Sequence, residues 1–432
     1  MRSVTGPTVR SPGRWGTVQV DDWGRTLLGA LLDSDPQLRA DPVSDGLAWR
    51  QSGAMQLTGR ADGPALGAPP LVVPGVRWLG GAAGIADRLD VLALLGERAA
   101  CAGLKRAGRT SCGGATRLLD AADGPVAISL ARPTDVALLP ALPGADRVDV
   151  DHWSALERML PSQSASHWVE QGSLLGMAIA ALGEVGRPTI DHPAVLAIDV
   201  GPGARIDVAN VRVLDLSSLW AGPLCAHILQ LHGADVAKAE SRERPDGARS
   251  GNPLFFDLVN AGKRCVPVDL STGGGRAALV ELINESDVVI EASRPRALEQ
   301  AGIFADTALR NGRTQVWVAI TGYGQSGWAR NRPAFGDDAA VAGGLVGWDA
   351  GTPVFLADAV ADPLTGLTAA AAAVAALRSD QRWYVDVSMA RVAATFAGGA
   401  ASTALRNEAA LTDASAPSPP RHRARLGVCE PL

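Results

Sequence analysis

From residue 211 onward, short apolar runs alternate with apolar positions at helical spacing. Val211, Val213 and Leu214 are β-branched or aliphatic residues in a short run that is typical of a strand buried on both faces of a parallel sheet. A helical spacing follows at residues 224–231, and Gly233 is placed to end that helix before a second apolar run at 236–239. The pattern therefore predicts strand, helix and strand, which is half of a nucleotide-type α/β domain.

The same alternation continues as far as residue 321. It predicts strands at 265–270, 288–291 and 316–321 and helices at 275–285 and 297–301. Strands separated by helices imply parallel βαβ units, and ligands usually collect at the carboxyl ends of such strands. We therefore expect a binding rim made of the loops at 217–223, 270–274, 292–296 and 322–327. An Ala-rich run at 367–377 is too short to cross a bilayer and predicts a buried helix.

The residues before this alternation differ in character and predict a separate region. The stretch 185–209 is rich in Pro and Gly and is typical of a linker, so we place a boundary near residue 205. The expected organisation is a smaller N-terminal α/β region over residues 1–205 and a core domain over residues 206–410. Residues 411–432 are rich in Pro, Ser and Arg without periodicity, and we expect them to be disordered.

Composition narrows the class of protein. The 432 residues are 47% hydrophobic and 20% charged, which is ordinary for a soluble globular protein. A net charge of -5, a pI near 5.7 and the lack of a basic stripe disfavour nucleic acid as a partner. Five cysteines without CxxC spacing suggest neither a disulfide framework nor a zinc site. We find no signal-peptide pattern and no long apolar segment, so we expect a cytoplasmic protein that does not span a membrane.

Several short sequence motifs follow one another along the second half of the chain. The chain reads D-L-S-x-x-x-A-G-P at residues 215–223 and G-A-D-V-x-K-x-E at residues 233–240. Further words follow at 261–264 (AGKR), 268–270 (VDL), 287–291 (DVVIE), 294–295 (RP), 321–324 (TGYG) and 362–366 (DPLTG). Together they resemble the family III CoA-transferases, which include formyl-CoA and carnitine CoA-transferases and α-methylacyl-CoA racemases.

The resemblance implies a Rossmann-like α/β fold with a parallel sheet, acyl-CoA and a small carboxylic acid as substrates, and no metal. It also implies a homodimer whose two chains are interlocked like links. CoA would lie along the rim, at positions matching Ser218, Ala221, Gly222, Pro223, Lys263, Val268, Ser271, Ala292, Ser293 and Arg294. Simpler roles are a turn for Gly222 and Pro223, a core position for Val268, solvation for Lys263, and pairing of Arg294 with Asp287 or Glu291.

Family III transferases work through one aspartate, which forms a mixed anhydride and then an aspartyl-CoA thioester. Asp362 is the first residue of the DPLTG motif at 362–366, which resembles the family pattern, and it precedes Pro363 at the start of the predicted apolar helix. It is therefore the candidate nucleophile. The simpler alternative is that Asp362 caps the helix. Asp358 is the second candidate for the nucleophile, or a like charge that raises the pKa of Asp362.

The N-terminal half resembles later parts of the same family. Residues 51–59, 122–128 and 175–182 are similar to segments that family members carry in their second half. Residues 1–205 would then echo the second half and residues 210–432 the first, as in a permutation or a decayed duplication. An unrelated N-terminal α/β domain is the alternative.

Departures from the family pattern keep other functions open. The racemase branch has a His-Asp pair where this chain has Asp337 and Asp338 after Gly336. The imidazole base is therefore missing, which disfavours proton transfer between two bases. Both aspartates are predicted to cap a helix or to hydrogen-bond a loop. The first loop has Ser218 and Trp220 where His or Gln is common. The alternatives are therefore a catalytically weakened acyl-CoA-binding protein or partner subunit, and an acyl-CoA racemase or isomerase.

Overall fold

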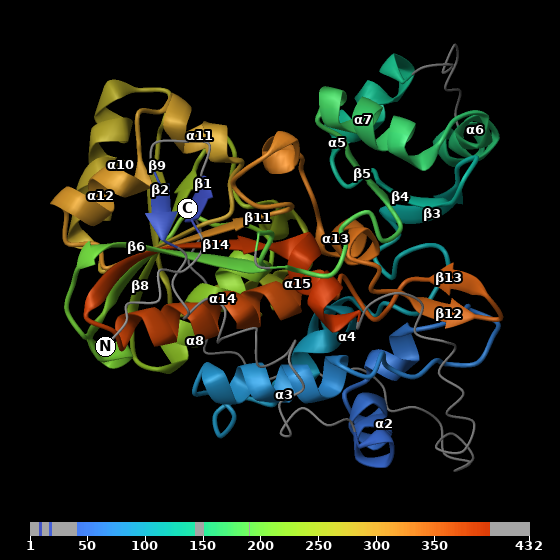
Figure 1. Ribbon diagram of the computed structural model, residues 1–432, viewed down its shortest axis with the longest axis horizontal. Helices are drawn as coiled ribbons and strands as arrows, with labels where there is room; N and C mark the ends of the chain where they lie inside the picture. Colours follow the sequence, from blue (N-terminus) through green and yellow to red (C-terminus); the bar gives the residue numbers. More distant parts are fainter. Residues whose placement is uncertain (1–7, 11–16, 20–40, 143–150, 190, 398–432) are drawn as a thin grey trace.

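A seven-stranded sheet forms the centre of the molecule (Figure 1). The computed structural model describes residues 8–10, 17–19, 41–142, 151–189 and 191–397, so the predicted disordered tail lies outside the described residues. In spatial order the strands are β9 (Arg264–Val268), β8 (Asp235–Ser241), β7 (Arg212–Asp215), β10 (Val288–Glu291), β11 (Val316–Thr321), β14 (Gln381–Ser388) and β6 (Val195–Pro202). All neighbouring pairs are parallel except β14 with the edge strand β6. The predicted α/β fold with a mostly parallel sheet is confirmed.

The order of the strands creates a switch point. The chain runs outward from β7 through β8 to β9 and then returns to β10 on the other side of β7. At such a point the connections on either side leave the sheet in opposite directions, which opens a crevice at the carboxyl ends of the strands. The loops after β7 and β10 therefore lie where a ligand is expected in a doubly wound sheet.

Helices cover both faces of the sheet, because alternate strand residues point to opposite sides. Val288 and Ile290 pack in one apolar core with α8 (Ala221–Leu231) and α14 (Ala361–Leu377). Val289 points the other way and packs in a second core with α10 (Gly273–Glu285) and α12 (Ala305–Asn311). The remaining helices of this region are α9 (Pro253–Asn260), α11 (Pro295–Gln300), α13 (Gly336–Ala342) and α15 (Met389–Phe396).

The N-terminal helices belong to the same core as the sheet. These are α2 (Pro42–Gln51), α3 (Val72–Ala82) and α4 (Glu97–Ala102), and α3 lies against α14 (Figure 1). Trp49 and Val76 are fully buried in the core that contains Leu364 of α14. The predicted boundary near residue 205 therefore does not separate two cores. The interpretation of residues 185–209 as a linker is wrong, because β6 lies within them and pairs with β14.

A small antiparallel sheet lies to one side (Figure 1). Its strands are β3 (Thr116–Asp120), β4 (Pro125–Ser129) and β5 (Ala178–Ala181), packed with α5 (Pro133–Leu138), α6 (His152–Met159) and α7 (Ala165–Leu175). Its contact with the main sheet runs through α13, which lies against β4 and β5. The remaining strands form two hairpins, β1 (Thr8–Arg10) with β2 (Thr17–Gln19) and β12 (Gly347–Asp349) with β13 (Thr352–Val354). Among the described residues, no helix has the length and apolarity needed to cross a membrane.

Candidate active site

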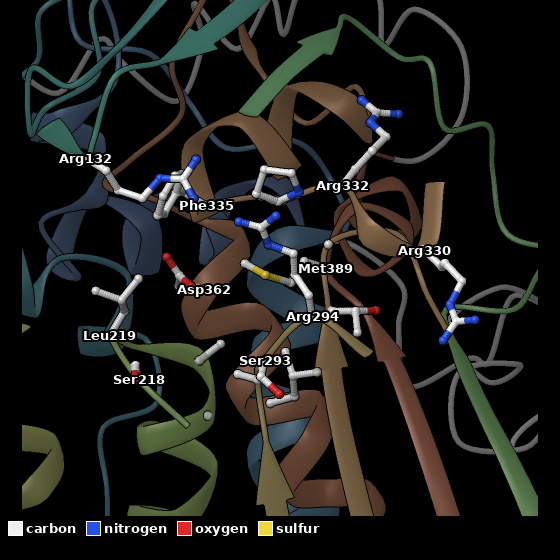
Figure 2. A pocket seen from close by; sticks show the side chains of 18 residues that line it. Arg132, Ser218, Leu219, Ser293, Arg294, Arg330, Arg332, Phe335, Asp362 and Met389 are labelled. Atoms are coloured by element: carbon white, nitrogen blue, oxygen red, sulfur yellow. The ribbon is translucent and has the colours of Figure 1, made fainter. Parts of the chain in front are cut away.

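A cavity of about 250 Å³ lies at the switch point of the sheet. The loop after β7 contributes Ser218 and Gly222, the loop after β10 contributes Arg294, and α14 contributes Asp362 (Figure 2). The other lining residues are Arg132, Leu219, Ala221, Ala292, Ser293, Ile320, Thr321, Gly322, Arg330, Arg332, Pro333, Ala334, Phe335 and Met389. The cavity therefore joins the ends of four parallel strands with a residue of the small sheet region, Arg132.

Glycines in α8 and α14 allow close packing beside this cavity. A Cβ on Gly222, in the first turn of α8, would lie 2.2 Å from the Ser217 Cβ, so the loop closes tightly only with glycine there. Gly366 of α14 lies against α8, since a Cβ there would be 2.8 Å from the carbonyl oxygen of Ala221. This close crossing brings the start of α14, and with it Asp362, beside the loop that follows β7.

Two buried lysines hold the first loop at both ends. Lys238 Nζ donates to the carbonyl oxygen of Ser217 at 2.8 Å, and Lys263 Nζ donates to that of Pro223 at 2.9 Å. Lys263 also pairs with Asp215 at 2.8 Å, and both side chains are fully buried. Burial alone would raise the pKa of Asp215, but Lys263 and Lys238 hold it below its usual range. Lys263 thus lies inside the protein and away from the cavity.

Asp362 lies in the first turn of α14 and is partly exposed, towards the cavity. Val360 occupies the N-cap position and no side chain caps this helix, so Asp362 is not the cap. Burial raises the pKa of Asp362 to about 7; Arg98 opposes the rise, whereas Asp337, Asp338 and Asp358 add to it. A carboxylate that is poorly solvated and still able to ionise near neutral pH suits nucleophilic attack.

The two aspartates of α13 hold backbone groups, as predicted. Asp338 accepts hydrogen bonds from the Phe335 N–H at 3.0 Å and from Ser129 Oγ at 2.8 Å. Asp337 accepts from the Ala359 N–H at 3.1 Å. Burial raises the pKa of Asp337 to about 6 and that of Asp338 to about 7. Neither side chain lines the cavity.

Asp358, the second candidate, lies in an enclosed position. Its side chain is fully buried and accepts two hydrogen bonds from the Arg98 guanidinium, one from Nε and one from Nη2. It does not line the cavity. The carboxylate is therefore engaged by a cation, whereas that of Asp362 faces open space.

Four arginines stand around the cavity, and their partners differ. Arg132 pairs with Asp135, Arg330 with Glu299 and Arg332 with Glu184.

Arg294 has no ion-pair partner in the part of the chain that the structure describes. The two acidic residues that the sequence suggested as its partners are engaged elsewhere: Asp287 pairs with Arg313, and Glu291 accepts from Trp317 and Ser293. Burial and the neighbouring Arg132 lower the pKa of Arg294. Its guanidinium is thus placed to meet an anionic group in the cavity (Figure 2).

Of the predicted site residues, the structure brings seven together around the cavity. These are Ser218, Ala221, Gly222, Ala292, Ser293, Arg294 and Asp362. Val268 is buried in the core beneath α10, and Ser271 is exposed beside Asp269. Pro223, at the end of the first loop, and Lys263, which donates to its carbonyl oxygen, do not line the cavity. Sequence reasoning missed Arg132 and Arg98, which come from distant segments. It also missed Met389, although the alternating run at 381–388 was a signal for the strand that precedes it.

Replacing Gly336 by alanine is expected to lower activity by about a hundredfold, the scale of a misplaced reacting group. A Cβ there would lie 2.3 Å from Asp362 Oδ2 and 2.4 Å from the Ala359 carbonyl oxygen, so the carboxylate must move. Turnover and thermal stability should be measured together. Gly274→Ala, on a surface with nothing within 4 Å of the added carbon, is the control. Equal activity of Gly336→Ala and the control would contradict the placement of Asp362.

Comparison with known proteins identifies a family for the chain. Residues 208–424 match CoA-transferase family III. The chain is 33% identical over 204 residues to the succinyl-CoA--L-malate CoA-transferase beta subunit of Chloroflexus aurantiacus, covering 44% of this chain and 50% of that protein. It is 28% identical over 169 residues to a formyl-CoA:oxalate CoA-transferase of Escherichia coli, covering 37% and 40%. A solved CAIB/BAIF family protein from Brucella suis is 26% identical with a TM-score of 0.41, covering 51% and 60% of the two chains.

The chain belongs to CoA-transferase family III, and its relatives are transferases. The predicted family is confirmed. The chain spans about half the length of the curated relatives it matches.

Proposed function

We propose that this protein transfers CoA from an acyl-CoA to a carboxylic acid, with Asp362 as the nucleophile. The observation that carries the proposal is the position of the Asp362 carboxylate in the wall of the cavity at the switch point. The N-termini of α8 and α14 meet at the same cavity, and helix N-termini favour negative charge. The site can therefore stabilise both the attacking carboxylate and the oxyanion that forms on the thioester.

The first half of the reaction moves CoA onto the protein. One carboxylate oxygen of Asp362 attacks the thioester carbonyl, and the carbon–sulfur bond breaks to release CoA thiolate, leaving a mixed anhydride. The thiolate then attacks the Asp362 carbonyl carbon of the anhydride. The donor acid departs as a carboxylate that carries an oxygen from Asp362, and Asp362 becomes a CoA thioester.

The second half runs through the same intermediates in reverse. The acceptor carboxylate attacks the aspartyl thioester and displaces CoA thiolate, which gives a second anhydride. The thiolate attacks the acceptor carbonyl carbon, and the Asp362 carboxylate leaves with one oxygen from the acceptor. Arg294, with no ion-pair partner among the described residues, is placed to hold a carboxylate or phosphate of a substrate during these steps.

Several further expectations remain part of this proposal. They are CoA along the loops at Ser218 and Ser293, a homodimer in a cytoplasmic setting, and an N-terminal half that is permuted or duplicated relative to the family. A weakened acyl-CoA-binding protein is the alternative that the cavity allows if Asp362 forms no adduct. Racemisation would need a second base in the cavity, and among the described residues Asp337 and Asp338 are engaged outside it.

Chemical trapping separates the enzyme from the binding protein. We expect a panel of succinyl-CoA, formyl-CoA and acetyl-CoA to yield an adduct on Asp362 that hydroxylamine converts to a hydroxamate and borohydride reduces. Peptide mass spectrometry locates the modified residue, and Asp362→Asn is the control. Absence of any adduct across the panel would contradict the proposed function.

The rate of adduct formation is expected to rise with pH through about 7. The pKa of Asp362 is raised to about 7, so the carboxyl group is protonated and unreactive below that pH and ionised above it. Single-turnover rates measured from about pH 5.5 to about pH 8.5 test this. A rate that falls as pH rises across this range would show that a protonated group, and not the Asp362 carboxylate, limits the step.

A further inference from the structure

A cluster of charges lies behind Asp362, and its cation comes from outside the family-matched residues. Arg98 lies on α4, in the N-terminal part of the chain. Its Nε donates to Asp358 Oδ2 at 3.0 Å and its Nη2 donates to Asp358 Oδ1. The Asp358 side chain is fully buried, whereas that of Arg98 is 29% exposed. A bidentate guanidinium–carboxylate pair of this kind fixes the orientation of the carboxylate and favours its ionised form.

Arg98 also contacts two other parts of the site. Its guanidinium lies 5.6 Å from the ring centroid of Trp220, the residue before α8, and that ring packs edge-on against Phe255 at 5.0 Å. A Cβ on Gly113 would lie 3.3 Å from Arg98 Nη2, so the loop at 111–114 closes over the guanidinium. One side chain thus links the first loop, the loop at 111–114 and the segment before α14.

The segment that Arg98 holds is strained. Ala357 and Ala359, on either side of Asp358, have φ values of 51° and 44°. Alanine rarely adopts this left-handed region, and such strain persists only where the surroundings fix the backbone. Thr58 accepts from the Ala357 N–H at 2.9 Å and Asp337 from the Ala359 N–H, while the Ala359 carbonyl accepts from the Asp362 N–H at 2.8 Å. The strained turn therefore sets where Asp362 begins its helix.

We propose that Arg98 is a positioning residue for Asp362: it holds the turn at 357–359 through Asp358 and supplies a positive charge that favours the ionised form of the Asp362 carboxylate. The consequence for the reaction rests on the proposed function of Asp362 as nucleophile. The N-terminal half would then complete the site electrostatically.

The charges around Asp362 show why one cation matters. The charged groups on the protein side of Asp362 are Asp337 and Asp338 from α13, Asp358 from the strained turn and Arg98 from α4. Burial raises the pKa of the nearby Cys112 thiol, so that thiol stays neutral. The charged groups on the cavity side are Arg132, Arg294, Arg330 and Arg332. Three of the cavity arginines are paired with carboxylates. Arg98 opposes the rise in the pKa of Asp362 that burial and the three aspartates cause. Its removal leaves those three like charges without this counterbalance.

The test measures the ionisation of Asp362 directly and needs no substrate. Subtracting the infrared spectrum of Asp362→Asn isolates the band of the protonated Asp362 carboxyl, and its intensity is followed against pH. We expect a midpoint near 7 in the unmodified protein and a midpoint about one pH unit higher in Arg98→Gln. Arg98→Lys keeps the charge and should restore most of the original midpoint. An unchanged midpoint in Arg98→Gln would overturn the proposal.

Arg98→Gln leaves Asp358 buried without its partner and can fail to fold. The double variant Arg98→Gln/Asp358→Asn removes both charges of the pair, and its midpoint should still rise, because Arg98 acts on Asp362 more strongly than Asp358 does. A midpoint that stays or falls in the double variant would overturn the electrostatic role. Arg77→Gln breaks a surface pair with Asp45 and is the matched control, which should titrate like the unmodified protein.

Adduct formation with succinyl-CoA distinguishes the two proposals. A rise in the midpoint without any adduct on Asp362, across the whole acyl-CoA panel, would refute the proposed function and leave the charge role of Arg98 standing. Where the adduct forms, its pH profile in Arg98→Gln should move upward by the same interval as the infrared midpoint. If Arg98→Gln lowers the rate of adduct formation equally at every pH and leaves the midpoint of the pH–rate profile unchanged, Arg98 has only a structural role.

Discussion

Asp362→Asn is expected to lower the rate of CoA transfer by at least about a thousandfold, the scale of losing a covalent nucleophile. The amide has the shape of the carboxylate but cannot attack a thioester. Because burial and three neighbouring aspartates already disfavour the charged form of Asp362, the neutral amide should not lower the thermal stability. Steady-state turnover with succinyl-CoA and a panel of carboxylic acids, beside a melting curve, measures both effects.

Asp358→Asn is the matched comparison, since Asp358 is four residues away and the same charge is removed. This variant leaves Arg98 without its carboxylate partner, so its effect should include a loss of stability. Retained turnover in Asp362→Asn together with lost turnover in a folded Asp358→Asn would transfer the role of nucleophile to Asp358.

Lys263→Ala is expected to destabilise the protein by about 3–5 kcal/mol, the loss typical when one partner of a buried ion pair is removed. It leaves Asp215 buried and removes the donor to the Pro223 carbonyl, which fixes one end of the first loop. Denaturant unfolding measures the change in the free energy of unfolding. The exposed Lys105→Ala is the control.

This experiment also decides between two roles of Lys263. The sequence allowed a contact with CoA phosphates, whereas the structure encloses the ammonium group between Asp215, Asn260 and Pro223. Unchanged stability combined with a raised KM for acyl-CoA would contradict the buried position and favour the phosphate contact.

The local pattern of apolar residues was sufficient for most of the main sheet. The strand at 316–321 has the predicted bounds, and α8 begins at the predicted turn, because both depend on neighbours within a few residues. The edge strand β6 was missed because its Gly and Pro content is typical of loops. An edge strand tolerates such residues, since one side of β6 pairs with no other strand in the part of the chain that the structure describes.

The charged part of the site was harder to predict than the loops. Arg98 lies 260 residues before Asp358, and no spacing in the sequence connects them. Likewise, Lys263 and Asp215 are 48 residues apart, so their burial as a pair depends on the order of the strands. The position of Asp362 and of the first and third loops at the cavity could be predicted, because strand ends and short motifs are local signals. Their partners were set by tertiary packing.

Isotope transfer from the acceptor acid would reveal Asp362 as the nucleophile, because the proposed reaction moves one acceptor oxygen into Asp362 at each turnover. The protein should be incubated with an acyl-CoA and a carboxylic acid labelled with ¹⁸O in its carboxylate, and the peptide that contains Asp362 then weighed by mass spectrometry. We expect the label to accumulate in the Asp362 side chain with turnover and Asp362→Asn to acquire none. Complete conversion of the labelled acid to its CoA thioester with no label in that peptide would contradict this expectation.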